Sequence, residues 1–205
     1  MHTMCRAVIF FAGLMVSLAL IAPEGMAQAR RVTVPPAASK DKVVIRKFEG
    51  LGQSARIQSP QYQLNPSETS PKVREWARIQ VRFETDADWT DELEFRYFVQ
   101  VHNSKNNTDT LFPGTFQYID IPKGKQNLST VFLRPATLDR YGDVIGIAVE
   151  IFAKGEMVAF ACNPETPKGW WRLTTAKTMP GVLLERSQTP FAFVAFDSYV
   201  TAKPK

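Results

Sequence analysis

The chain has 205 residues, of which 44% are hydrophobic and 22% charged, and its formal net charge is +5. The Lys and Arg residues are spread among predicted strands and turns rather than gathered in a patch, which argues against a nucleic-acid partner. Of the two cysteines, only Cys162 lies beyond the N-terminal region, so the folded part of the chain has no intramolecular disulfide.

Residues 1–29 have the pattern of a secretory signal peptide. A short segment with one positive charge precedes the apolar run Ala7–Ala22, and Ala27-Gln28-Ala29 fits a cleavage site, with Gly25-Met26-Ala27 as a second candidate. The alternative is an uncleaved anchor, but the run is slightly short for a span, which needs about 20 apolar residues. We therefore expect a periplasmic, secreted or outer-surface bacterial protein with no membrane span after cleavage.

The rest of the chain is predicted to form one domain. Residues 30–42 contain Pro35-Pro36 and read as a flexible linker, residues 43–200 form the domain, and residues 201–205 form a tail. The first strand is expected at 43–48.

Two alternating strands are expected next, over 75–84 and 92–102, each with an apolar and a polar face. The stretch between them, 84–94, holds six carboxylates. It lacks the central Gly and the twelfth-position Glu of an EF-hand, so we expect a solvated acidic loop rather than a calcium site.

Further strands are expected at 110–121 and 128–134, with a helical turn within 135–143. The hairpin 144–162 is the most strongly patterned segment, and Lys154-Gly155 is predicted to form its turn. Pairing Ala153 with Glu156 places Ile147 opposite Cys162, which puts Cys162 on the core face.

A Pro-rich loop follows, and short strands are expected at 172–175 and 182–184. The last strand is predicted at 191–200; both its faces are apolar, so it should be covered on both sides. The whole pattern predicts an all-β, immunoglobulin-like β-sandwich of about eight to ten antiparallel strands with little helix.

No catalytic signature is present, and we predict that the protein is not an enzyme. Cys162 and His102 are expected on opposite kinds of strand face, which argues against a nucleophilic pair. Glu94 and Glu150 lie mid-strand, but no pattern brings them together as a glycosidase pair. One His and one Cys cannot form a zinc site, and no phosphate-binding glycine loop occurs, so no metal or cofactor is predicted.

Four aromatic residues are the candidate contacts for a ligand or partner. Trp170 and Trp171 end a loop, where aromatic rings can stack on sugars or anchor a protein; the alternative is that one of them caps the core. Trp76 and Phe98 interrupt otherwise polar strand faces. Either a loop or a partner covers them, or they form an exposed apolar patch.

Two segments carry a resemblance to a known family: IAVEIFAKGEMVAFACNPETPKGWW at 147–171 and LLERSQTPFAFVAFDSYV at 183–200. The chain resembles the small secreted immunoglobulin-like proteins encoded beside type IV pilus-assembly genes in mucin-degrading gut bacteria. The resemblance implies an envelope or extracellular protein with a binding or structural role at a pilus-like apparatus, and it transfers no functional residue. The chain lacks the pilin processing site and the paired cysteines of antibody domains.

Our leading hypothesis is therefore a non-enzymatic interaction protein whose partners are envelope or pilus-assembly proteins. The alternative is a carbohydrate-binding module that binds mucin glycans through Trp170 and Trp171. That alternative requires both rings to be exposed and coplanar with a groove.

Overall fold

The computed structural model describes residues 43–61, 72–165 and 167–204. The predicted signal peptide and linker lie outside these residues. The described part is all-β, as predicted, and its nine strands belong to one sheet. The strands are β1 (Val43–Glu49), β2 (Arg56–Gln58), β3 (Glu75–Asn103), β4 (Thr108–Leu133), β5 (Asp143–Ala153), β6 (Glu156–Asn163), β7 (Lys177–Thr178), β8 (Leu184–Glu185) and β9 (Thr201–Ala202).

Helical structure is limited to short segments. These are α1 (Pro135–Tyr141), α2 (Trp170–Leu173) and the 3-10 turns η1 (Gly52–Ala55), η2 (Arg186–Gln188) and η3 (Phe196–Ser198). The helical turn expected within 135–143 is confirmed as α1. The central path of the sheet runs β6-β5-β3-β4-β7, and the β4–β7 pair is parallel whereas every other pair in the described residues is antiparallel. The immunoglobulin-like part of the prediction remains a prediction.

The strands β3 and β4 form one long hairpin in place of the four shorter strands expected from the sequence. The prediction of an acidic loop at 84–94 is wrong, because these residues belong to β3 and pair with β4. Register shifts between Phe83 and Trp89 let the ladder bend without ending. The side chains of Thr85 and Asn127 donate hydrogen bonds to the Pro122 carbonyl, at 3.0 and 3.1 Å, and hold the bend.

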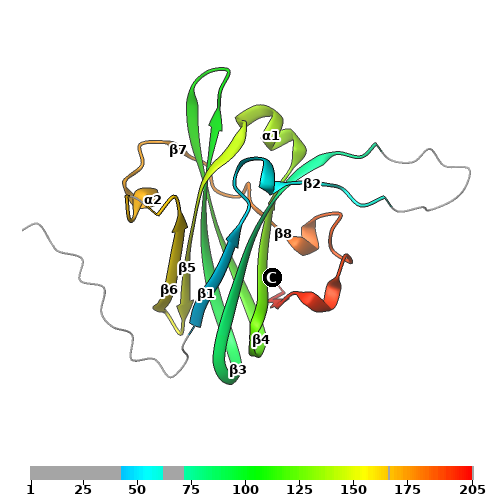
Figure 1. The fold of residues 1–205 in the computed structure, drawn as a ribbon, viewed down its shortest axis with the longest axis vertical. Coiled ribbons are helices and arrows are strands. Elements are labelled where there is room, and N and C mark those ends of the chain that lie inside the picture. Colours follow the sequence, from blue (N-terminus) through cyan, green and yellow to red (C-terminus); the bar gives the residue numbers. More distant parts are fainter. Residues whose placement is uncertain (1–42, 62–71, 166, 205) are drawn as a thin grey trace, which may run out of the picture. The chain divides into compact units, whose positions relative to one another are not determined.

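This hairpin folds back on itself, so that its two halves face each other. The rings of Phe83 and Phe95, on opposite sides of the bend, lie 5.1 Å apart. The hydroxyls of Tyr97 and Ser129 form a buried hydrogen bond of 2.7 Å between the halves. Figure 1 shows β3 and β4 turning together at the lower end of the sheet. The sheet therefore curls into two layers with the core between them, as in a β-sandwich.

The core consists of the alternating inward residues of these layers. Its largest fully buried side chains are Tyr97, Phe83, Phe95, Phe112, Phe132, Ile79, Leu93, Ile121, Leu133, Ile147, Ile151 and Val81. Alternation along the strands correctly predicts most of this set. Burial raises the pKa of the Tyr97 phenol well above its usual value, so the buried hydroxyl stays neutral.

The β5–β6 hairpin has the predicted turn, but its register is different. Lys154 and Gly155 both have positive φ, and Ala153 pairs with Glu156. A bulge between Ile151 and Phe152 then shifts the ladder, so that Cys162 lies opposite Ala148 rather than Ile147. The prediction that Cys162 faces the central core is therefore wrong, because one extra residue reverses the facing of every later side chain.

The predicted strand at 191–200 is also wrong. The segment consists of turns followed by η3, and Ala195 has a left-handed backbone with φ of 49°. Its apolar side chains are not covered on both sides: Phe193 is 81% exposed and Phe196 is 62% exposed. Local turns form here in place of an extended strand. The two-residue strands β8 and β9 flank the segment.

Candidate functional site

A hollow lies beside the C-terminal segment, and we call it the C-terminal groove. Its volume is about 610 Å³. Residues of the segment 185–204 and Leu128 of β4 line most of it, and Tyr118 and Thr130 of β4 line one side. Because β4 bends between these two residues, the groove lies where the two arms of β4 come together.

The C-terminal segment is held against both arms of β4 by its backbone. The strand β9 pairs with Tyr118 and Ile119 in the first arm, and the Lys203 amide donates to the Gln117 carbonyl at 2.8 Å. The Val200 amide donates to the Leu128 carbonyl, beyond the bend, at 3.2 Å. The segment thus connects the stretches of β4 on the two sides of the bend and borders the groove along both.

Two buried hydroxyls border the groove without a hydrogen-bond partner in the described residues. They belong to Tyr118 and Thr130, each 3% exposed. Burial raises the pKa of the Tyr118 phenol, and Ser129 and the Thr130 backbone lower it in part although neither meets hydrogen-bond geometry with the hydroxyl. An unpaired buried hydroxyl costs about 1–3 kcal/mol, and a bound polar group would remove that cost. These hydroxyls are the feature of the groove that points to a ligand.

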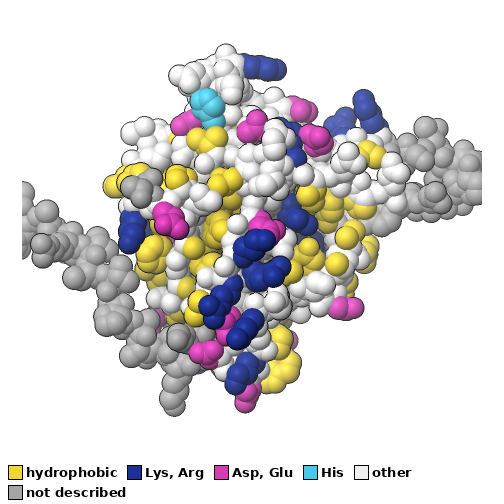
Figure 2. Space-filling model, in the orientation of Figure 1, with side chains coloured by type: hydrophobic (Ala, Val, Ile, Leu, Met, Phe, Trp, Pro, Cys, Tyr) yellow, Lys and Arg dark blue, Asp and Glu magenta, His cyan; other side chains and the backbone are white. Residues whose placement is uncertain are grey.

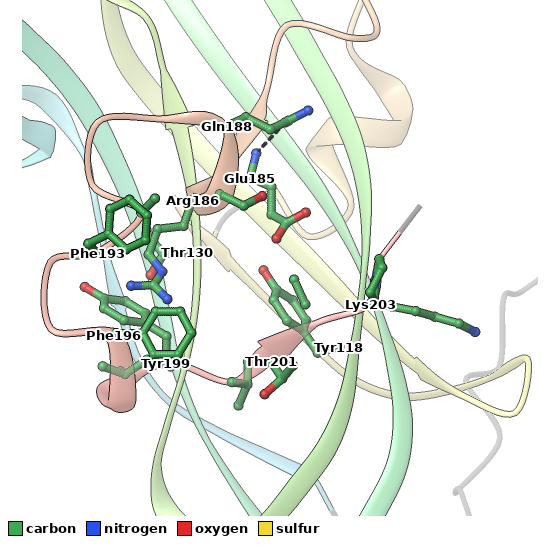
Figure 3. A pocket seen from close by; sticks show the side chains of 16 residues that line it. Tyr118, Thr130, Glu185, Arg186, Gln188, Phe193, Phe196, Tyr199, Thr201 and Lys203 are labelled. Atoms are coloured by element: carbon green, nitrogen blue, oxygen red, sulfur yellow. Dashed lines mark hydrogen bonds between the residues drawn. The ribbon is translucent and has the colours of Figure 1, made fainter.

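The opposite side of the groove is aromatic and cationic. Arg186 lies over the ring of Tyr199 at 4.4 Å and over that of Phe196 at 5.3 Å, and it donates to the Val194 carbonyl at 3.1 Å. Figure 3 shows the guanidinium among these rings, with Phe193 beside it, while the Lys203 side chain points the other way. The arrangement can bind an amphipathic group, with apolar contact at the rings and hydrogen bonds at the hydroxyls.

The turn that carries Arg186 is fixed by a reciprocal cap. The Gln188 side chain accepts from the Glu185 amide at 3.1 Å, and the Glu185 side chain accepts from the Gln188 amide. Sequence analysis did not single out any residue of this groove. The sequence feature that could have indicated the groove is the apolar run at 191–200, which we interpreted as a strand covered on both sides.

The two predicted loop tryptophans lie inside a satellite core. Trp170 and Trp171 are 8% and 5% exposed, and their rings meet edge to face at 85° with centroids 5.8 Å apart. Their indole N–H groups donate to the Pro164 carbonyl and to the Glu150 carboxylate. The rings are neither exposed nor coplanar, so the stacking surface that the glycan alternative required of them is not present.

The other two predicted contacts are covered by parts of the same chain. Trp76 is 9% exposed and packs edge to face on Phe191, with centroids 5.9 Å apart. Phe98 is half-buried against Trp171, at a centroid distance of 6.3 Å. Loops thus explain why these aromatics occur on polar strand faces. Whether any of the four predicted residues contacts a partner stays a prediction.

Glu150 anchors this satellite core, and we predict that Glu150→Ala destabilises the fold. The carboxylate is 4% exposed and accepts from Trp171 Nε1 and Arg172 Nε, each at 2.9 Å. Arg172 is half exposed, so water can solvate its guanidinium when Glu150 is removed. The free energy of unfolding should therefore fall by about 2–3 kcal/mol, which is less than for breaking a fully buried ion pair. Urea unfolding measures it. Glu156→Ala, at an exposed carboxylate, should change stability by less than about 0.5 kcal/mol, and equal losses would contradict the assignment.

Cys162 and His102 are held in different surroundings. Cys162 packs with Trp170 and Ala148, whereas His102 Nδ1 contacts the Asp109 carboxylate at 2.7 Å. Burial, and then the charge of Glu165, raise the pKa of the Cys162 thiol. The prediction that the chain is not an enzyme stays a prediction.

We accordingly predict slow alkylation of Cys162. Because only the thiolate reacts, iodoacetamide at pH 7.5 should modify the folded chain more slowly than the chain unfolded in urea. Faster modification of the folded chain, measured by mass spectrometry, would instead indicate an activated thiol.

Basic side chains gather along one face of the sheet. Figure 2 shows them as a line over β1 and β3. Lys47, Arg78 and Arg82 surround Glu49 and lower its pKa, with the hydrogen bond from Lys47 contributing most. Arg46 pairs with Glu84. These four cations share two carboxylates, so part of this positive charge is balanced within the chain. In the described ranges no helix is long and apolar enough to cross a bilayer.

Comparison with known proteins relates the chain to a solved structure and to a family. A crystal structure of a protein from Akkermansia muciniphila matches with a TM-score of 0.68 and 22% identity, covering 81% of this chain and 94% of that one. At this identity the match shows a shared fold. No curated protein matches. A family model matches residues 36–205, which include every described strand, and the chain therefore belongs to that family.

Proposed function

We propose that the chain is a non-enzymatic interaction protein of the bacterial envelope or cell exterior, working with a type IV pilus-like apparatus. The family match supports an assignment to the group that the sequence resembles, and the shared fold with a bacterial protein agrees with it. The pilus association rests on the resemblance. The single observation that carries a binding role is the C-terminal groove.

The occupant we propose is an extended, amphipathic segment of an envelope partner protein. Phe193 and Phe196 expose most of their ring surface, which a partner would remove from water. The partner segment would also supply polar groups for the Tyr118 and Thr130 hydroxyls. A purely apolar ligand would leave both hydroxyls unpaired, so the partner needs polar groups at that position.

A capture experiment with matched variants tests this function. Tagged residues 30–205 are mixed with detergent-solubilised envelope of the host, and bound proteins are identified by mass spectrometry. We expect pilus-assembly proteins to be recovered with the unchanged chain, to be lost with Phe193→Ala, and to be retained with Leu173→Ala. Leu173 is the matched control because it is 76% exposed but does not border the C-terminal groove.

Two results would contradict the proposal. Recovery of no pilus-assembly component, with retention on immobilised mucin glycans instead, would contradict the structural-partner role. Recovery that is equal for the unchanged chain and Phe193→Ala would show that the partner binds outside the groove.

A further inference from the structure

A second hollow lies at the bend of the sheet, and we call it the Trp89 cleft. Its volume is about 450 Å³. One side is formed by residues 89–96 of β3 and the other by residues 152–155 at the β5–β6 turn. Figure 1 places both the bend of β3 and this turn toward the lower end of the sheet. None of its lining residues borders the C-terminal groove.

Trp89 differs from the other three tryptophans of the chain. It is 67% exposed, whereas Trp76, Trp170 and Trp171 are each 9% exposed or less. The register shift before Trp89, where β3 pairs with Pro122, places the indole at the edge of the cleft. A large ring left in water at a concave surface is the usual feature of a site that binds a small molecule by contact with the ring face.

Thr90 supplies a second and independent observation. Thr90, Glu92, Glu94 and Arg96 are alternate residues on one face of β3, and Trp89, directly after the irregular register, joins them in the lining of the cleft. Thr90 is 4% exposed, and its hydroxyl has no hydrogen-bond partner in the described residues. A ligand hydroxyl in the cleft would provide the partner that this group lacks.

Three of the five charged residues that line the cleft are paired with one another or with a near neighbour, and the other two, Asp91 and Lys154, carry opposite charges. Arg96 Nε donates to the Glu94 carboxylate at 2.6 Å, and the guanidinium lies 4.0 Å above the Phe152 ring. Lys203 Nζ donates to the Glu92 carboxylate at 2.6 Å. These pairs leave little net charge for an ionic ligand, but their planar carboxylates and guanidinium keep free positions for hydrogen bonds. The chemistry favours an uncharged ligand with several hydroxyl groups.

We propose that the Trp89 cleft binds a neutral saccharide, with the C–H face of one pyranose ring on the Trp89 indole. The hydroxyls of that ring would bond to Thr90 and Glu92, two polar residues of the cleft that lie near Trp89 along β3. The volume lies in the range of small-molecule sites. The site is separate from Trp170 and Trp171, and it does not depend on the proposed partner of the C-terminal groove.

Tryptophan fluorescence tests the site directly, because Trp89 is the one tryptophan that a quencher can reach freely. Acrylamide quenching of residues 30–205 is measured while methyl β-D-galactopyranoside, methyl β-D-glucopyranoside or the methyl β-glycoside of N-acetylglucosamine is added to about 50 mM, a range that detects millimolar Kd values. We expect saturable protection from quenching by at least one of them. Trp89→Phe should remove the protection, Thr90→Val should weaken binding several-fold, and Leu173→Ala should leave it unchanged.

Several results would contradict the proposed saccharide site. Protection by none of the three saccharides, or the same protection in Trp89→Phe, would overturn the proposal. Protection by a captured envelope protein but by no saccharide would reassign the cleft to a protein partner. Since Phe193→Ala leaves the cleft intact, it should still show saccharide protection, which separates failure of this proposal from failure of the proposed function.

Discussion

Replacing Phe95 by Ala should lower the free energy of unfolding by about 3–5 kcal/mol. Phe95 is fully buried where the two halves of the long hairpin meet, and its ring contacts those of Phe83 at 5.1 Å, Tyr118 at 5.2 Å and Tyr97 at 6.2 Å. The loss combines the transfer of the ring to water with the cavity that remains. Urea unfolding followed by far-ultraviolet circular dichroism measures it.

The matched control is the same substitution at an exposed position. Phe193 is 81% exposed, so Phe193→Ala should change stability by no more than about 0.5 kcal/mol. Similar losses for the two variants would mean that the hairpin does not fold back on itself with Phe95 between its halves. The control also establishes that a loss of partner capture by Phe193→Ala is not caused by unfolding.

Gly142→Ala should cost about 3 kcal/mol, because position 142 has no room for a side chain. Gly142 ends α1 with φ of 90°, and its amide donates to the Leu138 carbonyl at 2.8 Å. A Cβ atom there would lie 2.0 Å from the His102 carbonyl oxygen, which belongs to the backbone of β3. Either α1 or the end of β3 would have to move.

Gly124 provides the comparison for this change. Gly124 lies in β4, and a Cβ atom there would meet nothing within 4 Å. Gly124→Ala should therefore be nearly neutral, and the difference in thermal midpoint between the two variants measures the clash. Equal midpoints would contradict the close approach of α1 to β3.

Alternation of apolar residues predicts the fold class and the core faces well. The inward residues Ile79, Val81 and Phe83 of β3 are all fully buried, as their spacing indicates. The turn at Lys154-Gly155 follows from the same local reasoning, since Gly readily adopts positive φ. These features depend on nearest neighbours in the chain, which a sequence shows directly.

The features missed by sequence analysis depend on contacts that are distant in the chain. The acidic stretch 84–94 looks like a loop, but pairing with β4 keeps it extended through the bend. The bulge between Ile151 and Phe152 has no local signature, yet it moves Cys162 to the other face. A bulge is decided by the fit of whole strands, so periodicity alone cannot locate it.

The candidate sites were the hardest part to predict, because exposure is a tertiary property. Trp170 and Trp171 are buried by their contacts with β5 and its Glu150, whereas Trp89, which the sequence places within an acidic stretch, is exposed at the bend. Phe193 lies in an apolar run that resembles a buried strand, but turns keep it at the surface. In each case the sequence shows the residue type but not which other residues surround it in the fold.

Site-specific photo-crosslinking in the living host tests the central claim most directly. Benzoylphenylalanine is placed at position 193, beside the C-terminal groove, or at position 173, which is similarly exposed but borders no part of it. The account predicts an ultraviolet-dependent adduct with a pilus-assembly protein from position 193 and none from position 173. An adduct from position 173 alone, or the same adduct from both positions, would contradict the groove as the binding surface.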